Sequence, residues 1–308
     1  NQVTYLFGTQ GGKTLELPAG ITTYSFACVL PESLPSSFEG KHGHIRYSCK
    51  AVVDRPWKAD KEFRLSFTVI KTENLSLSPE LAIPSKSEIV RHFYCCCIKS
   101  KPFFMSVTVP YSGYVPGQKI DVTINMNNQS STDIEGTKVS LERNTQYISQ
   151  TPHKKIRSET LTVREAYGSG MSKSGAGEVK LSLIVPPLAP TNVNFCKVII
   201  TRYQLRITSK ASGAHRNPHI NIPLRIGTVP VTQSLPAATF VGSPSSNPNP
   251  TAPPLDLPPP SYEEATKVEN EMGGDDVNIS VFQPRYPVWN FSSDAMPSAP
   301  PPPEILKL

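Results

Sequence analysis

The chain has 308 residues, of which 38% are hydrophobic and 18% are charged, and its formal net charge is +6 at pH 7. That length is enough for two domains of ordinary size. No run approaches 18 apolar residues, so the sequence contains no candidate membrane-spanning helix. It also lacks a nucleophile elbow, a phosphate-binding loop and a zinc-protease helix, so we expect neither an enzyme nor a bound cofactor.

Proline content and charge divide the chain into two regions. Residues 231–308 hold 16 of the 32 prolines, and their three basic and nine acidic residues give a net charge of −6. The other 28 basic and 16 acidic residues give residues 1–230 a net charge of +12. A segment rich in Pro, Ser, Asn and Ala without apolar runs cannot bury a core, so we expect residues 231–308 to be a disordered tail. A basic folded body favours anionic partners, such as a membrane surface or phosphorylated peptides. Nucleic acid is not expected as a partner, because no nucleic-acid-binding fingerprint accompanies the charge.

Apolar and polar side chains alternate in several short segments of the body. These segments are residues 45–51, 63–69, 120–126, 179–183, 198–208 and 220–226. A period of two with one polar face predicts half-exposed antiparallel strands, and no long window shows a helical period. Pro223 suits an edge strand or a bulge, because proline cannot donate a ladder hydrogen bond. The predicted class is all-β, built from β-sandwiches.

Residues 77–101 interrupt this alternation with prolines and charged side chains. We expect this segment to join two sandwich domains. The first would occupy residues 1–99 with the linker included and has few strands, and the second would occupy residues 100–230.

Three of the six cysteines, Cys95, Cys96 and Cys97, are consecutive. Such an arrangement is a poor disulfide framework and favours a reducing cytosol. Adjacent cysteines cannot all turn toward one tetrahedral ion, so no metal site is expected, even with His92 nearby. Two interpretations of the cluster stay open, namely buried linker cysteines and reversible acylation beside basic residues.

The tail contains a Pro-Pro-x-Tyr element formed by Pro259, Pro260 and Tyr262. Adjacent prolines preset a polyproline II backbone, which loses little entropy when it docks into an aromatic-lined groove. Tyr262 supplies a large amphipathic anchor. These residues predict a ligand for WW domains.

A second, weaker copy of this element lies 24 residues further on, at Pro284 and Tyr286. Gln283 replaces the first proline and removes one of two ring contacts, so we expect binding about tenfold weaker. Two such motifs on one chain suit a partner with adjacent WW domains.

Near the end of the tail, Pro297, Ser298, Ala299 and Pro300 form a Pro-Ser-Ala-Pro tetrapeptide. It is of the type bound by the ubiquitin-E2-variant domain of the endosomal sorting machinery. Small residues between the prolines let an extended chain lie close in a groove.

The body also carries a family resemblance. Residues 36–47, Ser-Ser-Phe-Glu-Gly-Lys-His-Gly-His-Ile-Arg-Tyr, and residues 50–57, Lys-Ala-Val-Val-Asp-Arg-Pro-Trp, resemble the N-domain signature of the α-arrestins, the arrestin domain-containing proteins. Residues 113–117 and 222–230 resemble the first and last segments of the arrestin C-domain. The resemblance covers residues 1–230 and implies two arrestin-like β-sandwiches, the first without its initial strands.

The same resemblance implies a function. α-Arrestins couple membrane cargo to WW-containing HECT ubiquitin ligases of the Nedd4 class. On that basis the body would contact transmembrane cargo such as receptors, the tail would recruit a ligase through Tyr262, and the protein would act in the cytoplasm at the plasma membrane and endosomes. The alternative is a signalling scaffold that binds SH3-type domains through segments such as Pro250 to Pro253. It is disfavoured because no Arg or Lys flanks that segment.

Overall fold

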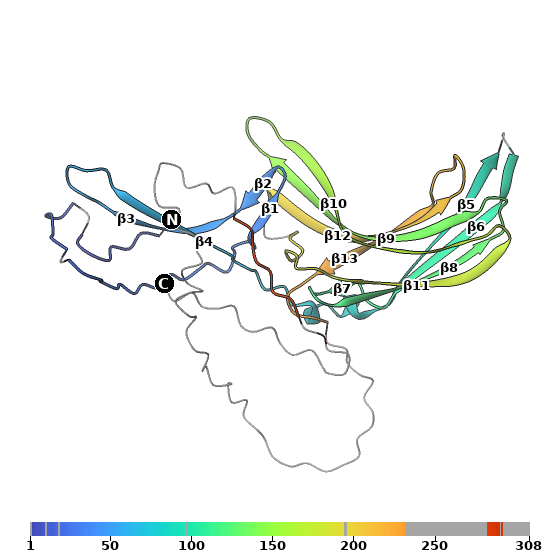
Figure 1. Cartoon of the computed structure of the whole chain (residues 1–308), viewed down its shortest axis with the longest axis horizontal. Coiled ribbons are helices and arrows are strands. Elements are labelled where there is room, and N and C mark those ends of the chain that lie inside the picture. Colours follow the sequence, from blue (N-terminus) through green and yellow to red (C-terminus); the bar gives the residue numbers. More distant parts are fainter. Residues whose placement is uncertain are drawn as a thin grey trace, which may run out of the picture. The chain divides into compact units, whose positions relative to one another are not determined.

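A computed structural model describes most of the body and a short part of the tail. The described residues are 2–9, 11–17, 19–95, 98–193, 196–231, 282–289 and 291, with the backbone alone for Cys95. Strands dominate this part of the chain, which contains no α-helix (Figure 1). The described tail residues from Gln283 onward belong to the same compact unit as the body.

The two largest sheets form a β-sandwich after residue 84. One has the strand order β10-β9-β12-β13-β7 and the other the order β11-β8-β6-β5 (Figure 1). Every pairing is antiparallel except the two-residue parallel pairing of β13 with β7. The strands are β5 (Ser85–Cys95), β6 (Ile98–Val109), β7 (Gly113–Tyr114), β8 (Lys119–Asn128), β9 (Ile134–Ser149), β10 (Lys155–Met171), β11 (Gly175–Ile184), β12 (Ile199–Ala211) and β13 (His219–Ile226).

The core of this sandwich comes from the inward faces of both sheets. Buried and more exposed positions alternate along β8, β12 and β13, which is the pattern expected of a strand with one face on a core. Burying each large apolar side chain contributes about 1.5–3 kcal/mol, so this cluster dominates the stability of the sandwich. Its most deeply buried members include Phe103, Met105, Ile120, Ile124, Leu141, Leu205, Ile207 and Ile222.

The residues before the sandwich form two small antiparallel hairpins. One pairs β1 (Phe38–Gly40) with β2 (Gly43–Ile45), and the other pairs β3 (Tyr47–Val53) with β4 (Lys61–Phe67). Two short 3₁₀ turns follow, η1 (Leu75–Leu77) and η2 (Pro79–Ala82). They lead the chain into β5.

The all-β class is confirmed, and each segment predicted from alternation falls largely on strands. Segment 45–51 lies on β2 and β3, segment 63–69 on β4, and segments 120–126, 179–183, 198–208 and 220–226 on β8, β11, β12 and β13. Pro223 faces Gln204 of β12, and β7 pairs with β13 only beyond it, at Arg225 and Ile226. Within the described residues Pro223 therefore occupies an edge position, as expected.

The interpretation of residues 77–101 as a linker needs correction. Most of this segment is strand, because β5 pairs with β6 along the edge of the four-stranded sheet. The four-stranded sheet therefore already includes Ser85–Cys95, within the segment expected to be a linker. The charged side chains of Lys86 and Glu88 form an ion pair on the exposed side of this edge strand, where they cost little to accommodate.

Candidate functional site

The first part of the candidate site is a contact between the β1–β2 hairpin and the sandwich. Phe38 of β1 packs in a small buried cluster with Tyr147 of β9, with Ile199 of β12 and with Ala189, which lies before β12. We call these four residues the hairpin cluster. The Phe-Glu-Gly-Lys-His-Gly stretch thus folds into a hairpin whose inner face lies on the second sandwich, which gives that sequence signature a structural role.

Close backbone approach at Gly40 allows this contact. A Cβ atom at Gly40 would lie 2.1 Å from the Tyr147 hydroxyl and 2.7 Å from the Phe38 ring, so a side chain has no room there. The Tyr147 hydroxyl donates to Glu159 Oε2 over 2.7 Å. Burial, together with this hydrogen bond, raises the pKa of Tyr147 to about 12.

Charged and aromatic side chains complete the hairpin contact. The Arg143 guanidinium lies 5.0 Å from the centre of the Phe38 ring, within the range of a cation–π interaction. His42 sits in the hairpin turn with its ring edge-on to Tyr147, 5.3 Å between centroids. His44 lies on β2, so only one of the two histidines is part of a strand.

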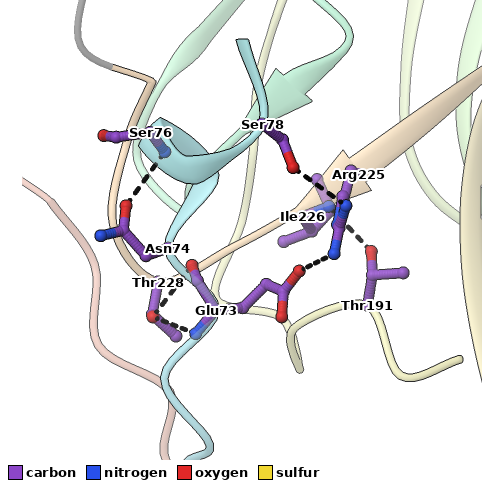
Figure 2. Close-up of polar contacts among 8 residues, drawn as sticks. All are labelled: Glu73, Asn74, Ser76, Ser78, Thr191, Arg225, Ile226 and Thr228. Carbon is purple, nitrogen blue, oxygen red and sulfur yellow. Dashed lines mark hydrogen bonds and ion pairs between the residues drawn. The ribbon is translucent and has the colours of Figure 1, made fainter. Parts of the chain in front are cut away.

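The second part of the site joins the end of the N-terminal region to the last strand of the sandwich (Figure 2). The Glu73 backbone N–H donates to Thr228 Oγ1 over 2.8 Å, and the Thr228 N–H donates to the Glu73 carbonyl over 2.9 Å. Asn74 forms a parallel bridge with Val229. Residues 73–75 therefore extend the strand ladder beyond β13, and we call this connection the latch.

An ion pair reinforces the latch from the side. The Glu73 carboxylate pairs with the Arg225 guanidinium, whose Nη1 also donates to Ser78 Oγ over 3.4 Å (Figure 2). The Glu73 side chain is only 12% exposed, whereas that of Arg225 is 38% exposed. Thr191 Oγ1 accepts from the N–H of Ile226, the last residue of β13, over 2.8 Å.

A buried apolar cluster includes Leu75 of the latch. Leu75 and Val115 are fully buried there together with Trp289, which is 8% exposed, and Leu81 and Val231 pack at the margin. We call this group the latch pocket. Trp289 comes from the tail, so the pocket is filled by a residue more than 50 positions after the last strand.

The described tail segment crosses the body between these two clusters. We call residues 284–289 the strap. The Arg285 N–H donates to Thr68 Oγ1 over 3.1 Å, and the Trp289 N–H donates to the Pro116 carbonyl over 2.9 Å. The Trp289 indole Nε1–H donates to the Thr228 carbonyl over 2.9 Å, which ties the strap to the latch.

Tyr286, which the sequence marked as a secondary WW-binding residue, lies in this strap. Its ring packs against the hairpin cluster and its hydroxyl donates to the Ser37 carbonyl over 3.0 Å. Burial raises the pKa of Tyr286 to about 12; Arg143 opposes this shift and Glu39 adds to it. Pro284, the other member of the motif, is buried.

The remaining predicted site residues lie outside the described part of the chain. They are Pro259, Pro260 and Tyr262 of the first motif, Pro297, Ser298, Ala299 and Pro300 of the tetrapeptide, and Cys96 and Cys97 with the Cys95 side chain. Sequence reasoning missed Trp289. The available signal was the concentration of aromatic residues around it, with Phe282, Tyr286 and Phe291 close by in a proline-rich tail.

The described residues hold no cluster of three or more His, Cys, Asp or Glu that could bind a metal ion. Cys28, Cys49 and Cys196 are free thiols. None of the helices that the structure describes has the length and apolar character needed to cross a bilayer.

Comparison with known proteins agrees with this architecture. The family model for the N-terminal domain of arrestin (or S-antigen) matches residues 1–76, and the model for its C-terminal domain matches residues 99–231. The fold and these matches define an arrestin-type β-sandwich protein. The chain belongs to the α-arrestin family, the arrestin domain-containing proteins.

Several curated relatives share this architecture. The chain is 31% identical to arrestin domain-containing protein 17 of Caenorhabditis elegans over 222 residues, which is 71% of this chain and 51% of that protein. It is 26% identical to arrestin domain-containing protein 1 of Homo sapiens over 259 residues, 84% of this chain and 57% of the relative. The chain is 30% identical to arrestin domain-containing protein 4 of Mus musculus over 221 residues, which is 71% of this chain and 51% of that protein. The chain thus spans between half and three fifths of the length of these relatives.

Proposed function

We propose that this protein is a non-catalytic adaptor that links membrane-protein cargo to Nedd4-class HECT ubiquitin ligases and so promotes ubiquitination, endocytosis and endosomal sorting of that cargo. The observation that supports this best is the combination of an arrestin body with the Pro-Pro-x-Tyr motif at Pro259, Pro260 and Tyr262 on the same chain. The body supplies a recognition scaffold, and the motif supplies the ligand for a WW domain of the ligase.

The charge of the body bears on where such an adaptor acts. Residues 1–230 carry +12, and the cytoplasmic leaflet of cell membranes is negatively charged. Attraction to that surface would bring the body to the cytoplasmic tails of transmembrane proteins such as receptors. We place the proposed activity in the cytoplasm, at the plasma membrane and on endosomes.

Replacing Tyr262 by alanine tests the ligase-binding role. The full-length variant is expected to lose most of its affinity for a single WW domain, by about 10-fold or more, because the remaining motif at Tyr286 is expected to bind about tenfold more weakly. Isothermal titration of the full chain with one Nedd4-type WW domain measures this effect. Tyr94→Ala, which removes an exposed tyrosine of the body, is the matched control and should bind as the parent does.

Tyr286→Ala should reduce the affinity of the full chain for the WW domain far less than Tyr262→Ala does. Equal losses from the two variants would contradict Tyr262 as the principal anchor. Retention of an SH3 domain by the unmodified chain, with no heat from the WW domain, would favour the signalling scaffold.

We also propose that the tetrapeptide at residues 297–300 binds the ubiquitin-E2-variant domain of the endosomal sorting machinery. Replacing Pro300 by alanine in the full chain should abolish the heat of binding to that domain and leave WW binding unchanged, because motifs that share no partner atoms act independently. If the parent chain gives no heat with the sorting domain, the tetrapeptide has no such role and the ligase-binding proposal still stands.

A further inference from the structure

We propose that the strap, residues 284–289, is an intramolecular ligand of the arrestin body and that its docking withholds Tyr286 from WW domains. The docking itself rests on observed contacts, and its consequence for WW binding rests on the function proposed above. The body thus carries a binding site for its own second motif.

The polar contacts of the strap are spaced along its whole length. Arg285 donates through its backbone to Thr68, and Tyr286 donates through its hydroxyl to the Ser37 carbonyl. Trp289 donates twice, from its backbone to Pro116 and from its indole to Thr228. Four hydrogen bonds between 2.9 and 3.1 Å from three residues fix the register of a segment that forms no strand.

The apolar contacts of the strap are two aromatic anchors three residues apart. Tyr286 packs on the hairpin cluster, and Trp289 fills the latch pocket beside Leu75 and Val115. Rigid aromatic side chains in buried pockets supply most of the energy in protein recognition sites. The backbone at Gly117 also contacts the strap closely, since a Cβ there would lie 2.1 Å from the Trp289 carbonyl oxygen.

The strap joins segments from both parts of the body. Ser37, Thr68 and Leu75 fall within the stretch matched by the arrestin N-terminal model, whereas Pro116 and Thr228 fall within the stretch matched by the C-terminal model. A docked strap therefore bridges the two arrestin-matched regions on the side of the molecule where the hairpin and the latch hold them together.

Docking and WW binding require the same groups of the motif. A WW domain recognises proline rings and a tyrosine side chain in its aromatic-lined groove. In this structure Pro284 is buried, and the Tyr286 ring and hydroxyl are both engaged by the body. Only the undocked strap can present both groups, so the apparent affinity of this motif falls in proportion to the undocked fraction.

Tryptophan fluorescence of the full chain tests the docking directly. The chain has two tryptophans, and Trp57 is fully exposed, so Trp57→Phe leaves buried Trp289 as the sole emitter. We expect blue-shifted emission that acrylamide quenches poorly. Trp289→Phe, which retains Trp57, provides the exposed reference.

A variant at the other anchor then tests coupling along the strap. Adding Tyr286→Ala to the Trp57→Phe chain should shift the emission of Trp289 and its quenching toward the exposed reference. Adding Tyr167→Ala, which removes an exposed tyrosine of β10, should leave both unchanged. If Trp289 in the parent Trp57→Phe chain emits and is quenched like the exposed reference, the docking is overturned. That result would leave the proposed binding of WW domains through Tyr262 untouched, because the Tyr262 titration tests it separately.

The masking of Tyr286 is tested by WW titration in a Tyr262→Ala background, where Tyr286 is the remaining tyrosine motif. If the strap is docked in about nine of ten molecules, releasing it should strengthen binding about 10-fold. Two variants should release the strap, one by a change in the tail and the other by a change in the body. Trp289→Ala removes the tail anchor, and Val115→Ala loosens the latch pocket without altering the tail.

Agreement between the two variants separates masking from a direct role of Trp289 in WW binding. Val90→Ala, at an exposed valine of β5, is the matched control for the body-side change and should have no effect. Unchanged or weaker WW binding in both releasing variants would overturn the masking. Failure of every variant to bind would show that Tyr286 is no WW site, which removes the masking and leaves the ligase proposal to Tyr262.

Discussion

Replacing Leu75 by alanine is expected to lower the free energy of unfolding by about 2–4 kcal/mol. Leu75 is fully buried between Val115 and Trp289, and its Cγ would lie 2.5 Å from a Cβ placed at Gly227. Truncation leaves a cavity at the point where the N-terminal segment, the last strand and the strap meet. Chemical denaturation followed by circular dichroism measures the loss.

Leu77 offers a matched control for this change, because it lies two residues away in the same 3₁₀ turn and is 80% exposed. Leu77→Ala should change the stability by less than about 0.5 kcal/mol, as surface substitutions usually do. In the Trp57→Phe chain, Leu75→Ala should also expose Trp289 to quencher. A stable Leu75→Ala protein with buried Trp289 would contradict the packing described for the latch pocket.

Replacing Gly40 by alanine should destabilise the hairpin contact by about 1–3 kcal/mol, the usual cost of inserting a methyl group into a close-packed site. The new Cβ would lie 2.1 Å from the Tyr147 hydroxyl and 2.7 Å from the Phe38 ring, so one of them must move. Gly43→Ala is the control. Its Cβ would meet the flexible end of Ile199 at 3.3 Å, and a smaller loss is expected.

A second-site change makes the Gly40 prediction sharper. Tyr147→Phe removes the clashing oxygen, so it should recover part of the stability that Gly40→Ala loses, although in the parent it sacrifices the hydrogen bond to Glu159. The four free energies form a double-mutant cycle whose coupling term should be favourable by about 0.5 kcal/mol or more. Purely additive effects would show that the glycine is not required by the Tyr147 contact.

The sequence predicted the strands whose two faces differ in polarity. Residues 120–126 and 220–226 alternate cleanly because one face lies on the core and the other faces solvent. The edge strand β5 was mistaken for a linker, since its exposed face carries charge and a bulge between His92 and Tyr94 breaks its period.

The alternation pattern did not predict strands β9 and β10, which have 16 and 17 residues. The reason differs between the two strands. β9 is central and buries polar residues such as Thr145 and Glu142, so its sequence does not alternate. β10 is the edge of its sheet and is exposed along much of its length, and only its pairing with β9 identifies it as a strand.

The candidate site was predictable in part. The family resemblance indicated the signature that forms the hairpin, and the Pro-x-Tyr spacing indicated the Tyr286 motif, but no local pattern indicates that these two meet. Their contact joins Ser37 to Tyr286, 249 positions apart, and depends on tertiary packing that no short window of sequence encodes. The role of Trp289 is hidden for the same reason.

The latch also sets an order of events during synthesis of the chain. Glu73 pairs with Thr228, and 155 positions separate them. At a translation rate of 5–20 residues per second, the segment that follows β4 waits about 8–30 s for its partner strand to be made. During that interval Leu75 has neither β13 nor Trp289 to cover it. Mutations that delay the completion of β13 would therefore extend the time for which nascent chains expose this apolar segment, and their first consequence would be aggregation during synthesis rather than a defect in the folded protein.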